Sequence, residues 1–228
     1  MPPEAPDYPA LCAEVRRAGL EPRGGLLAEA GEGLSAEAVW LLLLGAVGGS
    51  LWPAFATAPE AQDGAPDPLD RWSRRVVEGL AARLGARALY PFGGPPYRPF
   101  LRWARRAEGL SPSPLGMLMH PRHGLWHAYR GALAFAAVPA GWEAEAPLPS
   151  PCRSCAARPC LSTCPVGAFS AAGYDVAACR RHLARPEGAD CLTGGCRARR
   201  ACPQAPELRY AAEQAEFHMR AFLGARTP

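Results

Sequence analysis

The chain has 228 residues and a formal net charge of +4, with 25 basic and 21 acidic side chains. Every basic residue is arginine, because no lysine occurs anywhere in the sequence. A catalytic Schiff-base lysine and the lysine of a phosphate-binding loop are therefore excluded. A chain of this length can bury one good hydrophobic core and, beside it, a small module stabilised by metal.

The first 138 residues carry patterns typical of an α+β fold. The clearest signal is the apolar series from Leu69 to Leu84, which recurs at helical spacing and stops at Gly85. Other helices are expected at about 10–18 and 98–107, and strands at 24–30, 39–45, 86–92, 115–119 and 126–138. This order predicts an antiparallel or mixed sheet covered by helices. The isolated Cys12 is expected to fill apolar space.

Residues 38–58 carry no charge and are long enough to cross a bilayer. Three glycines and Pro53 follow the short run Val39–Leu44, and this pattern predicts a buried strand leading into a turn. We therefore expect no membrane partner. Because no targeting segment is recognised either, we expect a cytoplasmic protein.

Proline-rich residues 139–151 are expected to link two domains, one of residues 1–145 and one of residues 146–228. The stretch 206–223 is predicted to be helical, since its apolar residues share one face.

Eight of the nine cysteines lie in the second domain, where two groups each end in Cys-Pro. They are Cys152, Cys155, Cys160, Cys164, Cys179, Cys191, Cys196 and Cys202. Bacterial proteins with two [4Fe–4S] clusters use such motifs, and the last cysteine of each motif binds the other cluster. The spacing therefore predicts a small bacterial-ferredoxin-like module with two clusters. By this crossing rule, Cys202 joins the first three cysteines and Cys164 joins the remaining three.

Two alternatives for the cysteines stay open at this point. Short cysteine spacings also serve zinc, so eight thiolates can form two tetrahedral sites. A disulfide framework is the other, although it suits secreted chains with signal peptides. The proline after each motif favours iron–sulfur clusters. Arginines around the cysteines either balance the charge of such clusters or form a solvated surface.

The run LMHPRHGLWHAYRG at 118–131 resembles the signature of the CblC-type cobalamin-processing proteins, which remove the upper ligand of incoming cobalamin. DPLD at 67–70 and FHMRAF at 217–222 are similar to further segments of that family. The resemblance implies a nitroreductase-like or CblC-like fold and a bound corrinoid. CblC proteins of the animal type lack the eight cysteines, which is the main departure.

The cysteine-bearing domain resembles that of epoxyqueuosine reductase, a cobalamin-dependent enzyme that has two [4Fe–4S] clusters and acts on tRNA. That family also has a His-Pro-x-x-Gly-x-Trp segment. Its preceding Gly-Lys-Asn motif is replaced here by SPLG at 113–116, and its later Gly-Glu by Arg130-Gly131. Both differences favour corrinoid handling over tRNA modification.

Candidate corrinoid-binding residues come from the 118–131 segment, and no catalytic residue is assigned. Gly124 permits a close approach or a positive φ, Trp126 and Tyr129 offer aromatic faces, and Arg130 offers a forked donor. His120 is added because it belongs to the resembling motif. The alternative is structural: both aromatic residues can be core residues of a strand, and a lone histidine is more often part of the structure.

The sequence thus favours a corrinoid-dependent iron–sulfur oxidoreductase, whose most concrete activity is reductive removal of the upper ligand from cobalamin. The expected partners are the corrinoid and an electron donor such as a ferredoxin or flavodoxin, and a homodimer is left open. A tRNA-modifying reductase and an electron-transfer protein without corrinoid are the alternatives.

Overall fold

The computed structural model describes residues 7–171 and 173–224, and its contacts divide the chain into two compact units. One unit, here called the sheet unit, comprises Met1–Gly109 and His127–Pro147. The other, here called the cysteine unit, comprises Leu110–Trp126 and Leu148–Pro228. Residues 110–126 thus belong with the cysteines, although their place in the sequence led us to expect them in the first domain.

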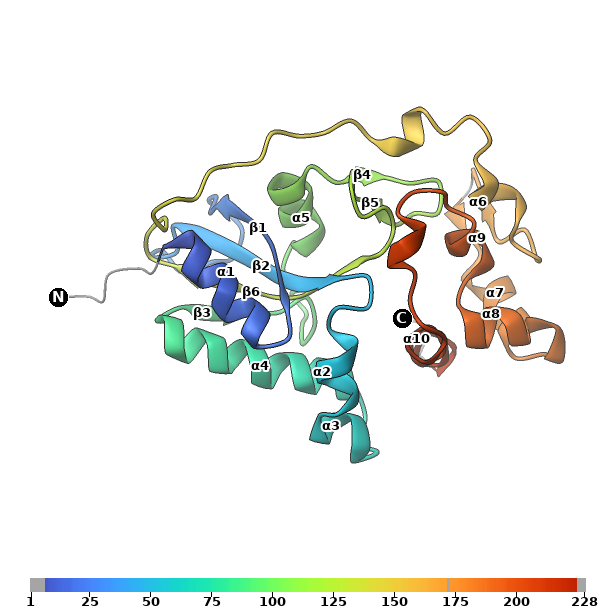
Figure 1. Ribbon diagram of the computed structural model, residues 1–228, viewed down its shortest axis with the longest axis horizontal. Coiled ribbons are helices and arrows are strands. Elements are labelled where there is room, and N and C mark those ends of the chain that lie inside the picture. Colours follow the sequence, from blue (N-terminus) through green and yellow to red (C-terminus); the bar gives the residue numbers. More distant parts are fainter. Residues whose placement is uncertain (1–6, 172, 225–228) are drawn as a thin grey trace. The chain divides into compact units, whose positions relative to one another are not determined.

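The sheet unit contains a four-stranded sheet in the order β1-β2-β6-β3, and every neighbouring pair is antiparallel (Figure 1). The strands are β1 (Glu21–Leu27), β2 (Trp40–Val47), β3 (Arg87–Leu89) and β6 (His127–Phe135). The predicted α+β fold with an antiparallel sheet is confirmed. β3 is shorter than the expected 86–92, because Pro91 has no N–H for the ladder.

The uncharged run at 38–58 includes a core strand. β2 is buried from Trp40 to Ala46, since it lies between β1 and β6. After the strand, the chain turns into the short helices α2 (Trp52–Ala56) and α3 (Pro59–Gln62). Within the described residues, no helix combines the length and the apolar character needed to cross a membrane.

Three longer helices complete the sheet unit: α1 (Tyr8–Arg17), α4 (Pro68–Leu84) and α5 (Phe100–Glu108). Figure 1 shows α4 and α5 on opposite sides of the strands. The predicted end of α4 is confirmed, because Gly85 caps it with a left-handed φ of 63°. Cys12 is buried in α1, as expected of an apolar filler.

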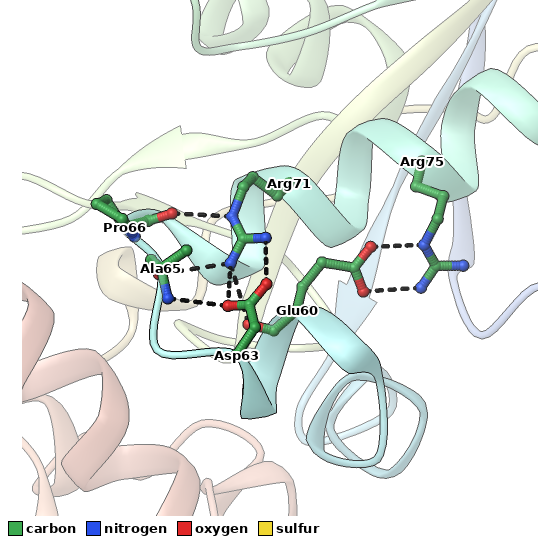
Figure 2. A network of polar contacts seen from close by, with 6 residues as sticks. All are labelled: Glu60, Asp63, Ala65, Pro66, Arg71 and Arg75. Carbon is green, nitrogen blue, oxygen red and sulfur yellow. Dashed lines mark hydrogen bonds and ion pairs between the residues drawn. The ribbon is translucent and has the colours of Figure 1, made fainter.

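A polar network fixes the start of α4 to α3 (Figure 2). Arg75 donates from Nε and Nη2 to the two carboxylate oxygens of Glu60, at 2.5 and 2.9 Å. One turn earlier, Arg71 donates to both oxygens of Asp63 at 2.7 Å. Paired forks of this kind restrict orientation as well as distance. The network therefore holds α4 in place, and α4 carries the partners of Arg130 described below.

The cysteine unit consists of short elements. Its helices are α6 (Pro159–Ser162), α7 (Val176–Leu183), α8 (Ala189–Gly194), α9 (Arg197–Arg200) and α10 (Ala212–Gly224). Its two hairpins pair β4 (Ser111–Pro112) with β5 (Leu118–Met119), and β7 (Phe169–Ser170) with β8 (Gly173–Tyr174). Single 3-10 turns occupy Pro151–Arg153, Pro186–Gly188 and Pro206–Leu208.

A small apolar core explains why residues 110–126 join the cysteine unit. Leu115, Met119 and Leu125 are buried against Ala198 and Cys202, which come more than 70 residues later in the chain. Four further cysteines pack against the same cluster, namely Cys152, Cys160, Cys164 and Cys196. The 110–126 segment therefore supplies much of the apolar cluster against which five of the eight cysteines pack.

Candidate metal centres

The eight cysteines of residues 152–202 line two cavities of the cysteine unit, four to each cavity. The first quartet, in a cavity of about 50 Å³, is Cys152, Cys155, Cys160 and Cys202. The second quartet, in a cavity of about 450 Å³, is Cys164, Cys179, Cys191 and Cys196. Each Cys-Pro cysteine lies with the three cysteines of the other motif, which is the grouping that the crossing rule predicts.

Two short helices produce this crossed grouping. Cys160 lies in α6 and Cys164 follows it, while α9 separates Cys196 from Cys202. At α6 and at α9, one helical turn thus separates a cysteine of one cavity from a cysteine of the other. α6 and α9 contact each other, and Leu115 lines both cavities. The two quartets are therefore neighbours.

Backbone N–H groups surround the sulfurs of the second quartet. The Sγ of Cys164 accepts from the Ala168 N–H at 3.3 Å. The sulfur of Cys196 accepts from the backbone N–H groups of Ala198 and Arg199. Hydrogen bonds to a sulfur stabilise its thiolate form. This environment suits thiolates that bind metal.

Tyr174 also contacts the second quartet, through a side-chain hydrogen bond to Cys179. Its ring stacks on Phe169, with centroids 4.7 Å apart, and faces Phe222 at 6.2 Å. Burial is the main cause that raises the pKa of Tyr174, followed by this hydrogen bond. The hydroxyl thus stays protonated and can donate to the sulfur.

Burial raises the pKa of five of these thiols. They are Cys152, Cys160, Cys179, Cys191 and Cys196. Stable thiolates here therefore need a nearby positive charge. Among the described residues that line the two cavities there is no carboxylate, whereas Arg158 lines the first, and Arg197 and Arg199 line the second.

The arrangement of the cysteines bears on the two alternatives. In the part of the chain that the structure describes, no three Cys, His, Asp or Glu side chains are grouped to hold one metal ion. This finding supports neither a zinc ion nor an iron–sulfur cluster at the cysteines, and the two clusters stay a prediction. All nine cysteines are free thiols in the structure.

His120 and Gly124 lie in the cysteine unit and form an isolated bridge with each other. The Nδ1 of His120 accepts from the backbone N–H groups of Arg122 at 2.9 Å and His123 at 3.0 Å. A neutral His120 therefore carries its proton on Nε2 and cannot coordinate a metal through Nδ1.

Gly124 has a φ of 59°, which corresponds to the positive-φ turn, one of the two alternatives that the sequence left open for this glycine. A Cβ added there would lie 2.7 Å from the carbonyl oxygen of Gln204. The group that approaches Gly124 closely is thus the backbone of Gln204, which follows the second Cys-Pro motif. Gln204 in turn donates from Nε2 to the Pro121 carbonyl at 3.0 Å. The turn of the resembling segment is thereby held against the loop that carries Cys202.

Trp126 is buried in the cysteine unit, where the Arg199 guanidinium lies 4.3 Å from its ring centroid. Tyr210 meets the same indole edge-on, with centroids 5.3 Å apart. Tyr210 and Arg199 were not assigned to a site from the sequence, since they lie over 70 residues from Trp126.

Tyr129 and Arg130 lie in β6 of the sheet unit, so the five candidate corrinoid residues are divided between the units. The Tyr129 hydroxyl donates to Glu108, which also accepts from the buried Arg23 at 3.0 Å. Burial is the main cause that raises the pKa of Tyr129, and the Glu108 charge adds to it. Tyr129 is therefore part of a partly buried polar cluster with Glu108 and Arg23.

Arg130 already has protein partners. Its Nε donates to the Ser73 hydroxyl at 2.9 Å, and its Nη2 is paired with Asp70. Its guanidinium carbon also lies 5.5 Å from the Phe92 ring centroid. The arginine in this strand thus has the partner that its position requires. A role of Arg130 in corrinoid binding stays a prediction.

Comparison with known proteins gives a structural likeness. A solved structure of the C. elegans B12-trafficking protein CblC, a human MMACHC homologue, matches with a TM-score of 0.50 and 13% identity. The match covers 97% of this chain and 100% of that chain. At this identity, it shows the fold alone. No family model matches the sequence, and no curated protein matches it.

Proposed function

We propose that this chain is an iron–sulfur protein that holds two [4Fe–4S] clusters and reduces a corrinoid. The observation that carries the proposal is the division of eight cysteines into two neighbouring quartets. When bound, such clusters supply one-electron transfer at low potential. The cavity linings support this cofactor, because they offer arginine and backbone N–H groups without carboxylates.

The corrinoid part of the proposal has two supports. The 118–131 segment resembles the CblC signature, and the fold is like that of a protein described as a B12-trafficking CblC. Reduction of cobalt to its lowest state requires a low-potential electron source, which the two clusters provide. The most concrete activity is reductive removal of the upper ligand of cobalamin.

The distribution of charge supports an acidic electron donor, such as a ferredoxin or flavodoxin. The cysteine unit has 12 arginines and 6 acidic residues, whereas the sheet unit has 13 and 15. Residues 146–174 contain no Asp or Glu. Arg153 and Arg158 are exposed there, beside the first quartet, and have no ion pair with a described residue. An acidic protein is attracted to such a surface.

Cobalamin titration of the anaerobically purified chain tests this function. The account predicts saturable binding, followed by a change in the visible spectrum of the corrinoid when reduced ferredoxin is added. In a matched variant, Cys155→Ser with Cys179→Ser, one ligand of each quartet is lost. We expect this variant to bind cobalamin without reducing it. Failure of the wild-type protein to bind cobalamin would reject the corrinoid role.

The positive charge of the cysteine unit also favours a second candidate, a reductase that acts on tRNA. This function predicts tight tRNA binding that weakens as the salt concentration rises. Absence of binding at low salt would exclude it, whereas tRNA binding without cobalamin reduction would make it the better account.

A further inference from the structure

Another cavity of the cysteine unit, of about 120 Å³, lies next to the second quartet. Cys196, Arg199 and Met219 line both this cavity and that of the second quartet. We call it the arginine cavity, because Arg199, Arg200 and Arg209 line it and no described acidic residue does. Its electrostatic character is therefore that of an anion site.

Aromatic rings and hydrogen bonds fix Arg199 in the wall. Its guanidinium carbon lies 4.3 Å from the Trp126 centroid and 4.7 Å from that of Tyr210. Its Nη2 donates to the Leu125 carbonyl at 2.6 Å and to the Tyr210 hydroxyl at 3.3 Å. A guanidinium held in this way loses little further freedom when it binds a ligand.

Two N–H donors of residues in this wall have no acceptor. Trp126 Nε1 and Arg199 Nε are shielded from solvent and have no hydrogen-bond partner among the described residues. The Trp126 side chain as a whole is only 3% exposed. Buried donors without acceptors are costly, and a ligand rich in acceptor oxygens removes that cost.

Arg209 adds a free charge at the edge of the arginine cavity. It is exposed, and it forms no ion pair with any residue that the structure describes. Arg200 differs, because its Nη2 is already paired with Asp190 at 2.6 Å. The residues that line the cavity thus include one fixed cation, one free cation and two side chains with an unsatisfied donor.

We propose that the arginine cavity binds a phosphate group through Trp126 Nε1, Arg199 and Arg209. The phosphate has two candidate sources with the same chemistry: free inorganic phosphate, or the phosphodiester in the nucleotide arm of cobalamin. The second source rests on the proposed function, whereas the first does not. In either case the bound anion lies beside Cys196, a member of the second quartet.

Calorimetric titration of the full chain with inorganic phosphate tests the site. We expect saturable binding that weakens about 10-fold in Trp126→Phe, which keeps the ring under Arg199 but removes the donor. Arg209→Gln should weaken binding by a similar factor. The control Arg185→Gln, at an exposed arginine outside the cavity, should bind like the wild type. Thermal unfolding verifies that the variants fold.

Absence of saturable phosphate binding, or equal affinity in all three variants and the wild type, would overturn the proposal. A second titration compares cobalamin with cobinamide, which lacks the phosphodiester. If the corrinoid is the source, Arg209→Gln weakens cobalamin binding and leaves cobinamide unaffected, and phosphate competes with cobalamin. If neither corrinoid binds, the proposed function fails, and the phosphate titration still decides the site.

Discussion

Cys202 provides a sharp test of how the cysteines are divided. It belongs to the second Cys-Pro motif, yet it lines the first cavity together with Cys155. Cys202→Ser should therefore remove the cluster of the first quartet and spare that of the second. The alternative is a grouping along the sequence, in which the first four cysteines bind one cluster and the last four bind the other. Cys202 would then share a cluster with Cys179, and Cys202→Ser would remove that cluster and spare the one that contains Cys155.

The iron content of double variants distinguishes the two groupings. Each quartet binds four irons, so the wild type should contain about eight and Cys202→Ser about four. Adding Cys155→Ser, in the same quartet, should leave about four irons. Adding Cys179→Ser, in the other quartet, should leave about zero. The grouping along the sequence predicts the reverse for the two double variants.

The assay is colorimetric iron and sulfide on anaerobically reconstituted protein, with electron paramagnetic resonance of the reduced samples. Cys12→Ser is the matched control, because Cys12 is buried in α1 of the sheet unit, outside both quartets. It should retain about eight irons. If the Cys155/Cys202 double variant lost all its iron while the Cys179/Cys202 variant kept half, the crossed grouping would be refuted.

Three further predictions concern single side chains. Tyr174→Phe removes the hydrogen bond to Cys179, so the potential of the second cluster should fall in a redox titration; an unchanged potential would contradict this. Glu60→Gln should lower the free energy of unfolding at pH 7 by about 1 kcal/mol, because the ion pair with the largely exposed Arg75 is lost. The same ion pair lowers the pKa of Glu60 to about 2, so the stabilisation that it gives is lost as the pH falls from about 4.5 to 2. Denaturation curves of the variant and the wild type should therefore converge at the low end of this pH range. Arg153→Glu, at an exposed arginine outside both cavities, should slow reduction by ferredoxin about 10-fold at low salt, but not reduction by cationic methyl viologen; equal slowing with both reductants would contradict an acidic donor at this surface.

Local patterns in the sequence predicted much of the sheet unit. The apolar series of α4 and its Gly85 cap follow from helical spacing and backbone freedom, and both are present in the structure. The buried strand in residues 38–58 follows from its apolar run and the glycines after it. The crossed grouping of the cysteines also follows from local spacing, because one helical turn separates the cysteines of different quartets at α6 and α9.

Contacts between distant residues could not be predicted in this way. Gly124 meets Gln204, and Trp126 meets Arg199, in each case across more than 70 residues. The assignment of residues 110–126 to the cysteine unit has the same cause, because their apolar partners come after the whole first Cys-Pro motif. The partly buried cluster of Arg23, Glu108 and Tyr129 likewise joins three separate elements without any periodic signal.

Elemental analysis of the anaerobically purified wild-type chain tests the central claim most directly. Two [4Fe–4S] clusters predict about eight irons and about eight inorganic sulfides per chain, without stoichiometric zinc. About two zinc ions per chain with no inorganic sulfide would contradict it.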